Sequence, residues 1–440
     1  MPCPVLTVTS SSDPRLAEFL QNLAGRGKPG EKAGQSIESE VLNILGQVRE
    51  RGDDALLEYG RKFDSPNLKA PLAVPEMELE LAAASIPAED LDIFREAAAN
   101  IREFHQAQKE KSWFMTRPDG SIFGQKVEAV ERAGLYVPGG RGGNTPLISS
   151  LLMGVIPAQV AGVREIAIVS PPREDGTINP YILALAYLLE IIEVYRTGGP
   201  WSIGALAYGT KSIRPVDVIA GPGNLYVATA KKLVQGRVGI DMLAGPSEIL
   251  VLADDSAIAG WVAADMLSQA EHDALASAIC VTDSASLADM LKQSLTQQLV
   301  DLPRSAEATA SLKDWGAIIV TPNMALAMEI NNMIAPEHLE IAVRDPWLLL
   351  PLVRHAGAIF LGHFCPEAIG DYFAGPNHVL PTMGTARFSS ALSVQTFCKK
   401  SSVISASPAC IRSSAPGVAS LARLEGLEAH ARSVEARTRR

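Results

Sequence analysis

Residues that could hold a metal ion or move a proton stand at four places in the second half of the chain. Gln269 and His272 lie three apart in the segment DMLSQAEH, so a helix would set both on one face. Asp371 follows an apolar run, and Glu425 and His430 lie close to the end. Gln269, His272, Asp371 and His430 would together provide nitrogen and oxygen ligands that zinc accepts. Their spacing does not establish that they converge, and each taken alone is more simply a capping or solvated polar residue.

A carboxylate and an imidazole stand side by side in the segment PEHL, as Glu337 and His338. This pair could transfer protons near neutral pH if burial and neighbouring charges set both pKa values suitably. Adjacent residues need not face one site, so the dipeptide alone is more simply a surface feature. Asn377 and His378 lie with Asp371 in AIGDYFAGPNHVLPT, a Gly- and Pro-punctuated segment typical of a functional loop.

A glycine-rich turn occupies residues 136–143, with the sequence YVPGGRGG. Its backbone N–H groups and the guanidinium of Arg141 could bind an anion or a cofactor phosphate, and a tight surface turn is an equal alternative. No G-x-G-x-x-G follows any expected strand, so the usual dinucleotide fingerprint is absent. Any nucleotide cofactor must therefore bind in another way.

The elements expected around these residues indicate an α/β fold. Amphipathic spacing predicts a helix over residues 89–108 and a helical tail that includes 417–437. Nearly continuous apolar runs, typical of strands buried on both faces of a parallel sheet, occupy residues 165–170, 193–196, 216–220, 248–253, 317–321 and 358–362. Several of these runs lead directly into glycine or proline, where ligands gather in such sheets. We therefore expect a layered α/β architecture.

Length and composition exclude several classes of protein. The chain has 440 residues, of which 47% are hydrophobic and 20% charged, which does not fit a disordered chain or a coiled-coil rod. Its net charge of −10, without a basic face, argues against a nucleic-acid partner. The longest apolar run, YILALAYLL, is too short to cross a membrane, and the opening residues do not resemble a secretory signal. Five cysteines without a C-x-x-C pair predict reduced thiols, and we expect a cytoplasmic protein.

Taken together and in order, these segments resemble the histidinol dehydrogenase family over about residues 37–437. The resemblance lies in YVPGG at 136–140, IPAQVAGV at 156–163, GPGN at 221–224, DMLAGPSE at 241–248, LSQAEH at 267–272, PEHLE at 336–340, GDYFAGPNHVLPT at 370–382 and EGLEAHARSV at 425–434. It implies a zinc-dependent enzyme that oxidises L-histidinol through the aldehyde to L-histidine with reduction of two NAD, the last steps of histidine biosynthesis.

The resemblance also assigns roles to single residues. It implies Glu337 and His338 as catalytic residues, with His338 as the base and Glu337 activating the water that attacks the aldehyde. One zinc ion per subunit would be bound by Gln269, His272, Asp371 and His430. The substrate contacts would be Ser247, Gln269, His272, His338, Asp371, Glu425 and His430. Because tail residues of this family reach the neighbouring subunit, Glu425 and His430 would act across a homodimer with shared active sites.

The cofactor contacts depart from the family pattern. The NAD positions match Tyr136 and Asn224, but the usual glycine-glycine-alanine-glutamine turn is here Gly198-Gly199-Pro200-Trp201. An indole at Trp201 could stack on a flat ring of NAD in place of the glutamine contact. The turn at residues 139–144 also appears longer than usual.

The expected fold is two Rossmann-like layered α/β domains without the usual glycine fingerprint. We expect the first domain to be discontinuous, with residues 37–135 and 247–380, and the second to span 136–246. A helical arm of residues 1–36 and a helical tail of residues 381–440, packed on a partner subunit, would complete the chain.

Three alternatives to a histidinol dehydrogenase remain at this stage. The nearest is a paralogous zinc- and NAD-dependent dehydrogenase of another small polar alcohol, such as a sulfonated diol. The presence of Glu425 and His430 favours recognition of an imidazole and an amine instead. A zinc hydrolase and a non-catalytic binding protein are alternatives of a different class.

Overall fold

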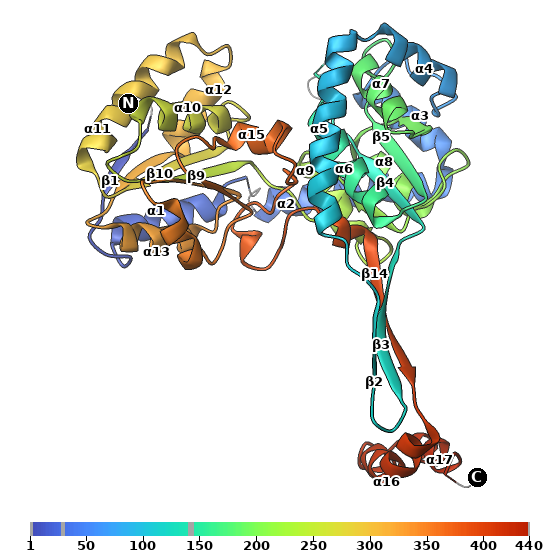
Figure 1. Ribbon diagram of the computed structural model, residues 1–440. Helices are drawn as coiled ribbons and strands as arrows, with labels where there is room; N and C mark the ends of the chain where they lie inside the picture. Colours follow the sequence, from blue (N-terminus) through green and yellow to red (C-terminus); the bar gives the residue numbers. More distant parts are fainter. Residues whose placement is uncertain (1–2, 28–30, 140–144, 439–440) are drawn as a thin grey trace.

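The computed structural model describes residues 3–27, 31–139 and 145–438. Figure 1 shows two α/β bodies beside each other and a narrow stalk that extends from one of them to a pair of helices near the C-terminus. The two bodies are built on parallel sheets, and the stalk is an antiparallel sheet. The expected α/β class with parallel sheets is therefore confirmed.

The first sheet has six strands, all parallel, in the order β1-β11-β10-β9-β12-β13. Their bounds are Val5–Thr7 (β1), Glu248–Ala253 (β9), Ser277–Thr282 (β10), Ala317–Val320 (β11), His338–Ala342 (β12) and Ala358–Leu361 (β13). The helices of this body are Pro14–Gly25 (α1), Ala259–Ala270 (α10), Ala285–Gln298 (α11), Ser305–Asp314 (α12), Met324–Ile334 (α13), Pro346–Leu349 (α14) and Glu367–Tyr372 (α15), with short 3-10 turns at Leu299–Asp301 and Leu350–Leu352.

Side chains of β9 alternate between two cores, one on each face of the first sheet. Ile249 and Val251 pack with α10, α11 and α12, whereas Leu250 and Leu252 pack with α1 and α13. Both faces are thus covered by helices, as a parallel sheet of nearly continuous apolar strands requires. The strand is apolar at nearly every position because neither of its faces meets water.

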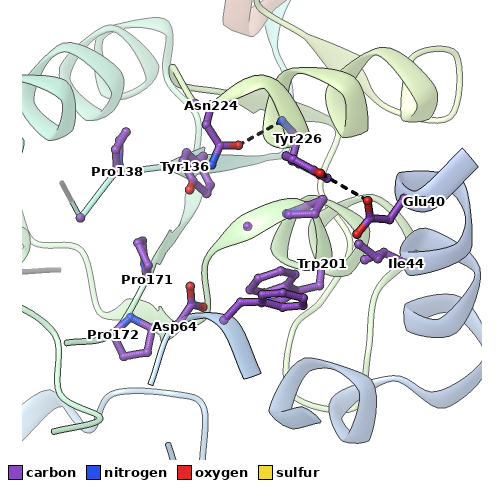
Figure 2. Close-up of a pocket in the computed structure, with 15 residues that line it drawn as sticks. Glu40, Ile44, Asp64, Tyr136, Pro138, Pro171, Pro172, Trp201, Asn224 and Tyr226 are labelled. Carbon is purple, nitrogen blue, oxygen red and sulfur yellow. Dashed lines mark hydrogen bonds between the residues drawn. The ribbon is translucent and has the colours of Figure 1, made fainter. Parts of the chain in front are cut away.

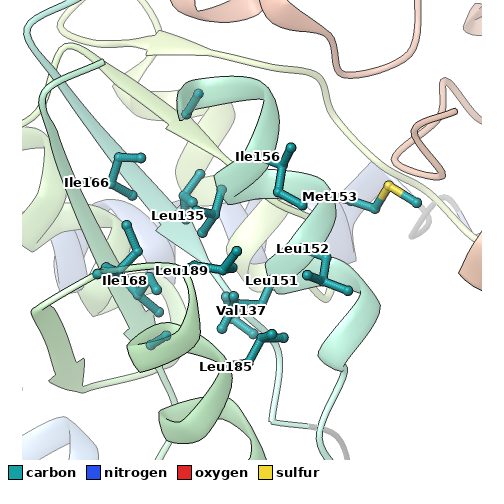
Figure 3. Close-up of a cluster of buried hydrophobic side chains, with 14 of the residues drawn as sticks. Leu135, Val137, Leu151, Leu152, Met153, Ile156, Ile166, Ile168, Leu185 and Leu189 are labelled. Carbon is teal, nitrogen blue, oxygen red and sulfur yellow. The ribbon is translucent and has the colours of Figure 1, made fainter. Parts of the chain in front are cut away.

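The second sheet has five parallel strands in the order β6-β5-β4-β7-β8. Their bounds are Arg132–Tyr136 (β4), Glu165–Ser170 (β5), Glu193–Arg196 (β6), Val218–Ala220 (β7) and Gly239–Ile240 (β8). The helices are Glu31–Arg51 (α2), Asp53–Phe63 (α3), Glu76–Ser85 (α4), Ala88–Ala107 (α5), Ile148–Ala161 (α6), Pro180–Leu188 (α7), Gly199–Tyr208 (α8) and Leu225–Val234 (α9). Figure 3 shows one of its two cores, where β4 and β5 meet α6 and α7.

The two sheets share one topology. In the second sheet β4 is central, β5 and β6 follow on one side, and β7 and β8 lie on the other. In the first sheet β9, β10, β11, β12 and β13 repeat this order, and β1 is added at the edge. Such an order creates a crevice at the carboxyl ends of the strands, beside the central strand, where the chain changes direction.

The contacts group the N-terminal third of the chain differently from the expected domains. Residues 37–135 were expected to join residues 247–380, yet α2 and α3 pack on α8 of the second body, and α5 packs on α6. The arm of residues 1–36 contributes β1 and α1 to the first body. Amphipathic spacing identifies a helix but not which of two apolar sheets it covers.

The stalk consists of three antiparallel strands, Trp113–Thr116 (β2), Ile122–Ala129 (β3) and Cys398–Ser405 (β14), in the order β14-β3-β2. Two short 3-10 turns, Thr385–Arg387 and Val394–Phe397, lie before β14. The helical tail that follows comprises Pro408–Leu424 (α16) and Glu428–Glu435 (α17), which turn on Gly426, whose φ is +76°. Figure 1 shows this helix pair far from the first sheet. Within the described residues, no helix has the length and hydropathy needed to span a bilayer.

Candidate functional site

The catalytic pair expected from the sequence lies at the amino edge of the first sheet. His338 opens β12 beside Ile249 of β9, and Glu337 immediately precedes it. The connection between β9 and β10 passes through α10, which runs back across the sheet, so its last turn returns Gln269 to this edge. The loops after the strands, where the sequence favoured a ligand site, lie at the opposite edge.

His338 is buried, and its ring is fixed by one main-chain contact. Its Nδ1 lies 2.9 Å from the carbonyl oxygen of Glu248, which can only accept, so Nδ1 carries the proton of the neutral ring. Burial lowers the pKa of His338 and keeps the ring neutral. Nε2 is then unprotonated, and it has no hydrogen-bond partner within the described chain. It can therefore act as a proton acceptor.

Glu337 is held by Glu248 through two reciprocal hydrogen bonds. The amide of Glu248 donates to Oε2 of Glu337 at 2.8 Å, and the amide of Glu337 donates to Oε2 of Glu248 at 3.3 Å. Burial, followed by the charge of Glu248, raises the pKa of Glu337 well above its usual range. A carboxylate of raised pKa is a stronger proton acceptor once it is ionised.

A short helix brings two more carboxylates to His338. Glu367 and Asp371 are four apart on one face of α15, with Oε1 of Glu367 3.8 Å and Oδ1 of Asp371 4.0 Å from Nε2 of His338. One ligand atom from each of these three residues lies within 4.8 Å of the others. Burial and then the charge of Glu367 raise the pKa of Asp371 to about 8. Glu367 belongs to none of the motifs found in the sequence, although its i, i+4 spacing to Asp371 was a usable signal.

Gln269 and His272 lie beside this cluster. Gln269 is fully buried, and neither polar atom of its amide has a partner among the described residues. Its neighbour Ser268 donates its hydroxyl to Oε2 of Glu367 at 3.2 Å. His272 follows the end of α10 and is exposed, near enough that its charge acts on His338. Unpartnered buried oxygen and nitrogen atoms among carboxylates fit a divalent cation.

His378, which the sequence analysis placed in the loop with Asp371 but gave no role, also belongs to this cluster. Its Nδ1 lies 4.0 Å from Oδ1 of Asp371. Burial and then the charge of His338 lower the pKa of His378 to about 4, so this ring is neutral at physiological pH. Its Nε2 is buried and unpartnered within the described part of the chain. The loop spacing of Asp371 and His378 predicted their proximity but not their burial.

The remaining expected site residues divide into two groups. Ser247 lies next to Glu248 and so sits at the same edge of the sheet, with its carbonyl accepting from Ser277 at 3.0 Å. Glu425 ends α16, and His430 lies on α17, both exposed at the far end of the stalk. A single chain therefore brings Ser247, Gln269, His272, His338 and Asp371 to one region, and it does not bring Glu425 or His430 there.

A separate cavity of about 540 Å³ opens at the carboxyl ends of the strands of the second sheet. Figure 2 shows Tyr136 at the end of β4, Pro138 after it, Pro171 and Pro172 after β5, and Asn224 at the start of α9 facing this cavity. This is the crevice that the strand order creates beside β4. Asn224 caps α9 by accepting from the amides of Tyr226 and Val227, so the positive N-terminal end of this helix adjoins the cavity. The arrangement suits a nucleotide without any G-x-G-x-x-G.

Comparison with known proteins gives a match across nearly the whole chain. A sequence model described as histidinol dehydrogenase matches residues 28–438. The chain belongs to the histidinol dehydrogenase family. This family consists of NAD-dependent oxidoreductases.

Relatives of known name agree with this family. The chain is 58% identical over 439 residues to the histidinol dehydrogenase of Nitratidesulfovibrio vulgaris, covering 99% of each. It is 58% identical over 438 residues to that of Oleidesulfovibrio alaskensis, covering 99% of this chain and 100% of the other. A crystal structure of histidinol dehydrogenase from Elizabethkingia anophelis matches with a TM-score of 0.91 at 37% identity, over 98% of each chain.

Trp201, expected from the sequence to contact NAD in place of a glutamine, lies in the wall of this cavity. Its ring contacts both Tyr59 and Phe63 of α3, with centroids 5.6 Å from each, and the three rings form one cluster. Trp201 is 4% exposed, and its Nε1 has no partner among the residues described. Asp64 lies beside this stack and accepts from the amide of Gly198 at 3.2 Å. Burial raises the pKa of Asp64 to about 7.

The glycine-rich turn expected to contact the cofactor lies mostly outside the described residues. The longer glycine-rich turn at residues 139–144, expected to bind an anion through Arg141, lies outside the described residues except for Gly139. Gly139 lines the cavity with Tyr136 and Asn224. The three expected NAD contacts, Tyr136, Trp201 and Asn224, therefore line one cavity of this histidinol dehydrogenase fold.

Proposed function

We propose that this chain oxidises L-histidinol to L-histidinaldehyde and then to L-histidine, with reduction of two NAD. The observation that carries the proposal is the unprotonated, unpartnered Nε2 of His338 within the described residues, held among carboxylates by the main chain of Glu248. Oxidation of an alcohol needs a base that removes the hydroxyl proton while hydride leaves carbon. NAD, when bound, supplies the acceptor for that hydride.

His338 would act in the first oxidation. Nε2 accepts the proton of the substrate hydroxyl, while its Nδ1–H bond to Glu248 stabilises the ring as it becomes charged. The nearby carboxylate of Glu367 favours the imidazolium that forms. A well-placed base of this kind is worth about 10²–10⁴-fold in rate.

Glu337 would act in the second oxidation. Its Oε2 is fixed by the amide of Glu248 and can take a proton from the water that attacks the aldehyde. The raised pKa of Glu337 makes its ionised form a suitable base for water. The hydrated aldehyde then gives hydride to the second NAD and loses a hydroxyl proton, and the acid is formed.

A zinc ion, when bound, would hold the imidazole and amino nitrogens of the substrate and fix its carbinol carbon. We propose that Gln269, His272 and Asp371 hold it together with His430 of the partner subunit. The fit of a cation is supported by the unpartnered amide of Gln269 and the crowded carboxylates, within the described chain. Ser247 and Glu425 would complete the substrate contacts.

The tail is the reason to propose a homodimer with shared sites. α16 and α17 pack chiefly on each other at the end of the stalk, and their exposed apolar side chains include Leu421 and Leu424. Helices this short do not bury enough surface to be stable alone. A second copy of the chain would cover them and receive His430 and Glu425.

All five cysteines are unpaired, which supports a reducing compartment such as the cytoplasm.

The test is a steady-state assay with L-histidinol and NAD that counts NADH formed per histidine. Two NADH per histidine, abolished by a chelator and restored by zinc, are expected. Activity on a sulfonated diol but not on L-histidinol would favour the paralogous dehydrogenase. Ester or amide cleavage without NADH would favour a zinc hydrolase, and neither activity would favour a binding protein.

A further inference from the structure

A buried arginine from the N-terminal arm reaches the residue that holds the catalytic pair. Arg26 follows the end of α1, and its side chain is fully buried. Nη2 donates to Oε1 of Glu248 at 2.6 Å and to the carbonyl of Pro246 at 3.4 Å. Among the described residues, Arg26 is the ion-pair partner of Glu248. Arg26 is 222 positions away from Glu248 in sequence.

Glu248 contacts both catalytic residues through its main chain. Its amide binds Glu337 Oε2, and its carbonyl accepts from His338 Nδ1. Its side chain binds Arg26 and the amide of Glu337. A shift of Glu248 would therefore move the Glu337 carboxyl and the His338 ring together.

Arg26 also places a positive charge beside two buried carboxyl groups of the site. Glu248 and Glu337 are two buried carboxyl groups, each accepting from the amide of the other residue, and the Arg26 guanidinium forms an ion pair with Glu248. Because Nη2 lies on Glu248, the guanidinium favours the carboxylate form of that residue against the burial that raises its pKa, and the charge of Glu248 in turn raises the pKa of Glu337.

The guanidinium is not saturated by structural contacts. Nε and Nη1 of Arg26 are buried without a partner in the described part of the chain. Leaving such donors unpaired costs free energy. Arg132, the buried arginine of the second sheet, binds Glu193 through both Nη1 and Nη2 and Glu165 as well, so among the described residues its Nε alone lacks a partner. A purely stabilising arginine would be expected to resemble Arg132.

We propose that Arg26 is a positioning residue of the active site, which acts through Glu248 to hold Glu337 and His338 in place. This inference rests on the proposed function, since it takes these two as the catalytic pair. The N-terminal arm is then part of the catalytic apparatus and not only an edge of the sheet.

The experiment compares Arg26→Gln and Arg26→Lys with wild type in the full-length enzyme loaded with zinc. We expect Arg26→Gln to lower kcat for L-histidinol about 10²-fold with KM changed less than about threefold, because misplacing a catalytic group affects turnover. Arg26→Lys should recover most of kcat, since a single nitrogen makes the contact to Glu248. Arg132→Gln is the matched control for loss of a buried ion pair, and it should lose thermal stability while kcat per folded molecule is unchanged.

If Arg26→Gln does not fold, the double variant Arg26→Gln/Glu248→Gln leaves no buried charge unpaired. Its kcat should still fall at least about tenfold, since two neutral amides hold Glu248 less firmly than the ion pair. A folded Arg26→Gln or double variant with the kcat of wild type would overturn the proposal, and so would a loss of kcat that Arg26→Lys does not recover. Glu337→Gln and His338→Asn in the same assay separate a failure of the Arg26 proposal from a failure of the proposed catalytic pair. If both retain full activity, the proposed catalytic pair itself fails.

Discussion

Nε2 of His338 lies 3.8 Å from Oε1 of Glu367, and neither atom has a hydrogen-bond partner within the described residues. Two buried polar atoms that face each other beyond hydrogen-bond reach are costly unless something binds between or beside them. This pair therefore marks the centre of the candidate site more directly than any sequence motif. Its carboxylate comes from a residue that no motif identified.

Replacing Glu367 tests whether this centre binds a cation. Glu367→Gln keeps the shape of the side chain and removes its charge, so we expect zinc affinity to fall about 10- to 100-fold. Calorimetric titration of metal-free protein with zinc measures the change. Glu329→Gln, an exposed position on α13, is the control. Equal zinc affinity in both variants would show that Glu367 does not contribute to the metal site.

The two catalytic residues should separate the two oxidations. His338→Asn removes the base, so the rate of histidinol oxidation should fall about 10²–10⁴-fold, with binding of histidinol little changed. Glu337→Gln should mainly slow conversion of the aldehyde to the acid, because its carboxyl is needed to activate water. Single-turnover measurements with L-histidinol and with L-histidinaldehyde distinguish the steps. Equal effects of both variants on both steps would contradict these roles.

Asp64 predicts a pH dependence of stability. Burial raises the pKa of this carboxyl from its ordinary value near 4 to about 7, so between these pH values the folded state holds a proton that the unfolded state has lost. Stability from this group is therefore greatest below about pH 4 and declines as pH rises towards 7. Asp64→Asn should be close to wild type in melting temperature at pH 4 and more stable at pH 8. The exposed Glu80→Gln serves as control, and a melting-temperature difference independent of pH would contradict the prediction.

Much of the parallel-strand framework was predictable from sequence. β5, β6 and β9 have the expected bounds, because strands buried on both faces form apolar runs between polar turns. β12, in contrast, contains Glu340 and begins with His338, so its pattern lacks such a run. The stalk strands β2 and β3 are largely exposed and have no core face to impose alternation.

The candidate site was predictable where its residues share one helix or loop. Gln269 and His272 occur together, as do Asp371 and His378, and local spacing suggested each pair. The joining of these pairs depends on α10 and α15 meeting at the start of β12, which only the tertiary fold determines. Arg26 and Glu248 are a still longer-range contact, and nothing in either segment signals the other.

Trp201 should report NAD binding directly. The indole lines the cavity in a stack with Tyr59 and Phe63, so a flat ring bound there would quench its emission. Titration of wild type with NAD should reduce tryptophan fluorescence, and Trp201→Phe should lose most of that change while retaining measurable affinity. Trp347→Phe, at a 72% exposed position, should quench like wild type. Full quenching in Trp201→Phe would place NAD elsewhere.

Mixing of two inactive proteins tests the tail. His338→Asn lacks its base, and His430→Ala lacks a proposed metal ligand on α17, which in one chain is at the far end of the stalk from His338. If the tail serves the neighbouring subunit, a mixed dimer contains one site with both defects and one with neither. Random exchange of equal amounts makes half of the dimers mixed, so about a quarter of wild-type activity should return. Labelled subunits must be shown to exchange, and with exchange established, no recovered activity would mean that His430 serves its own chain or no site at all.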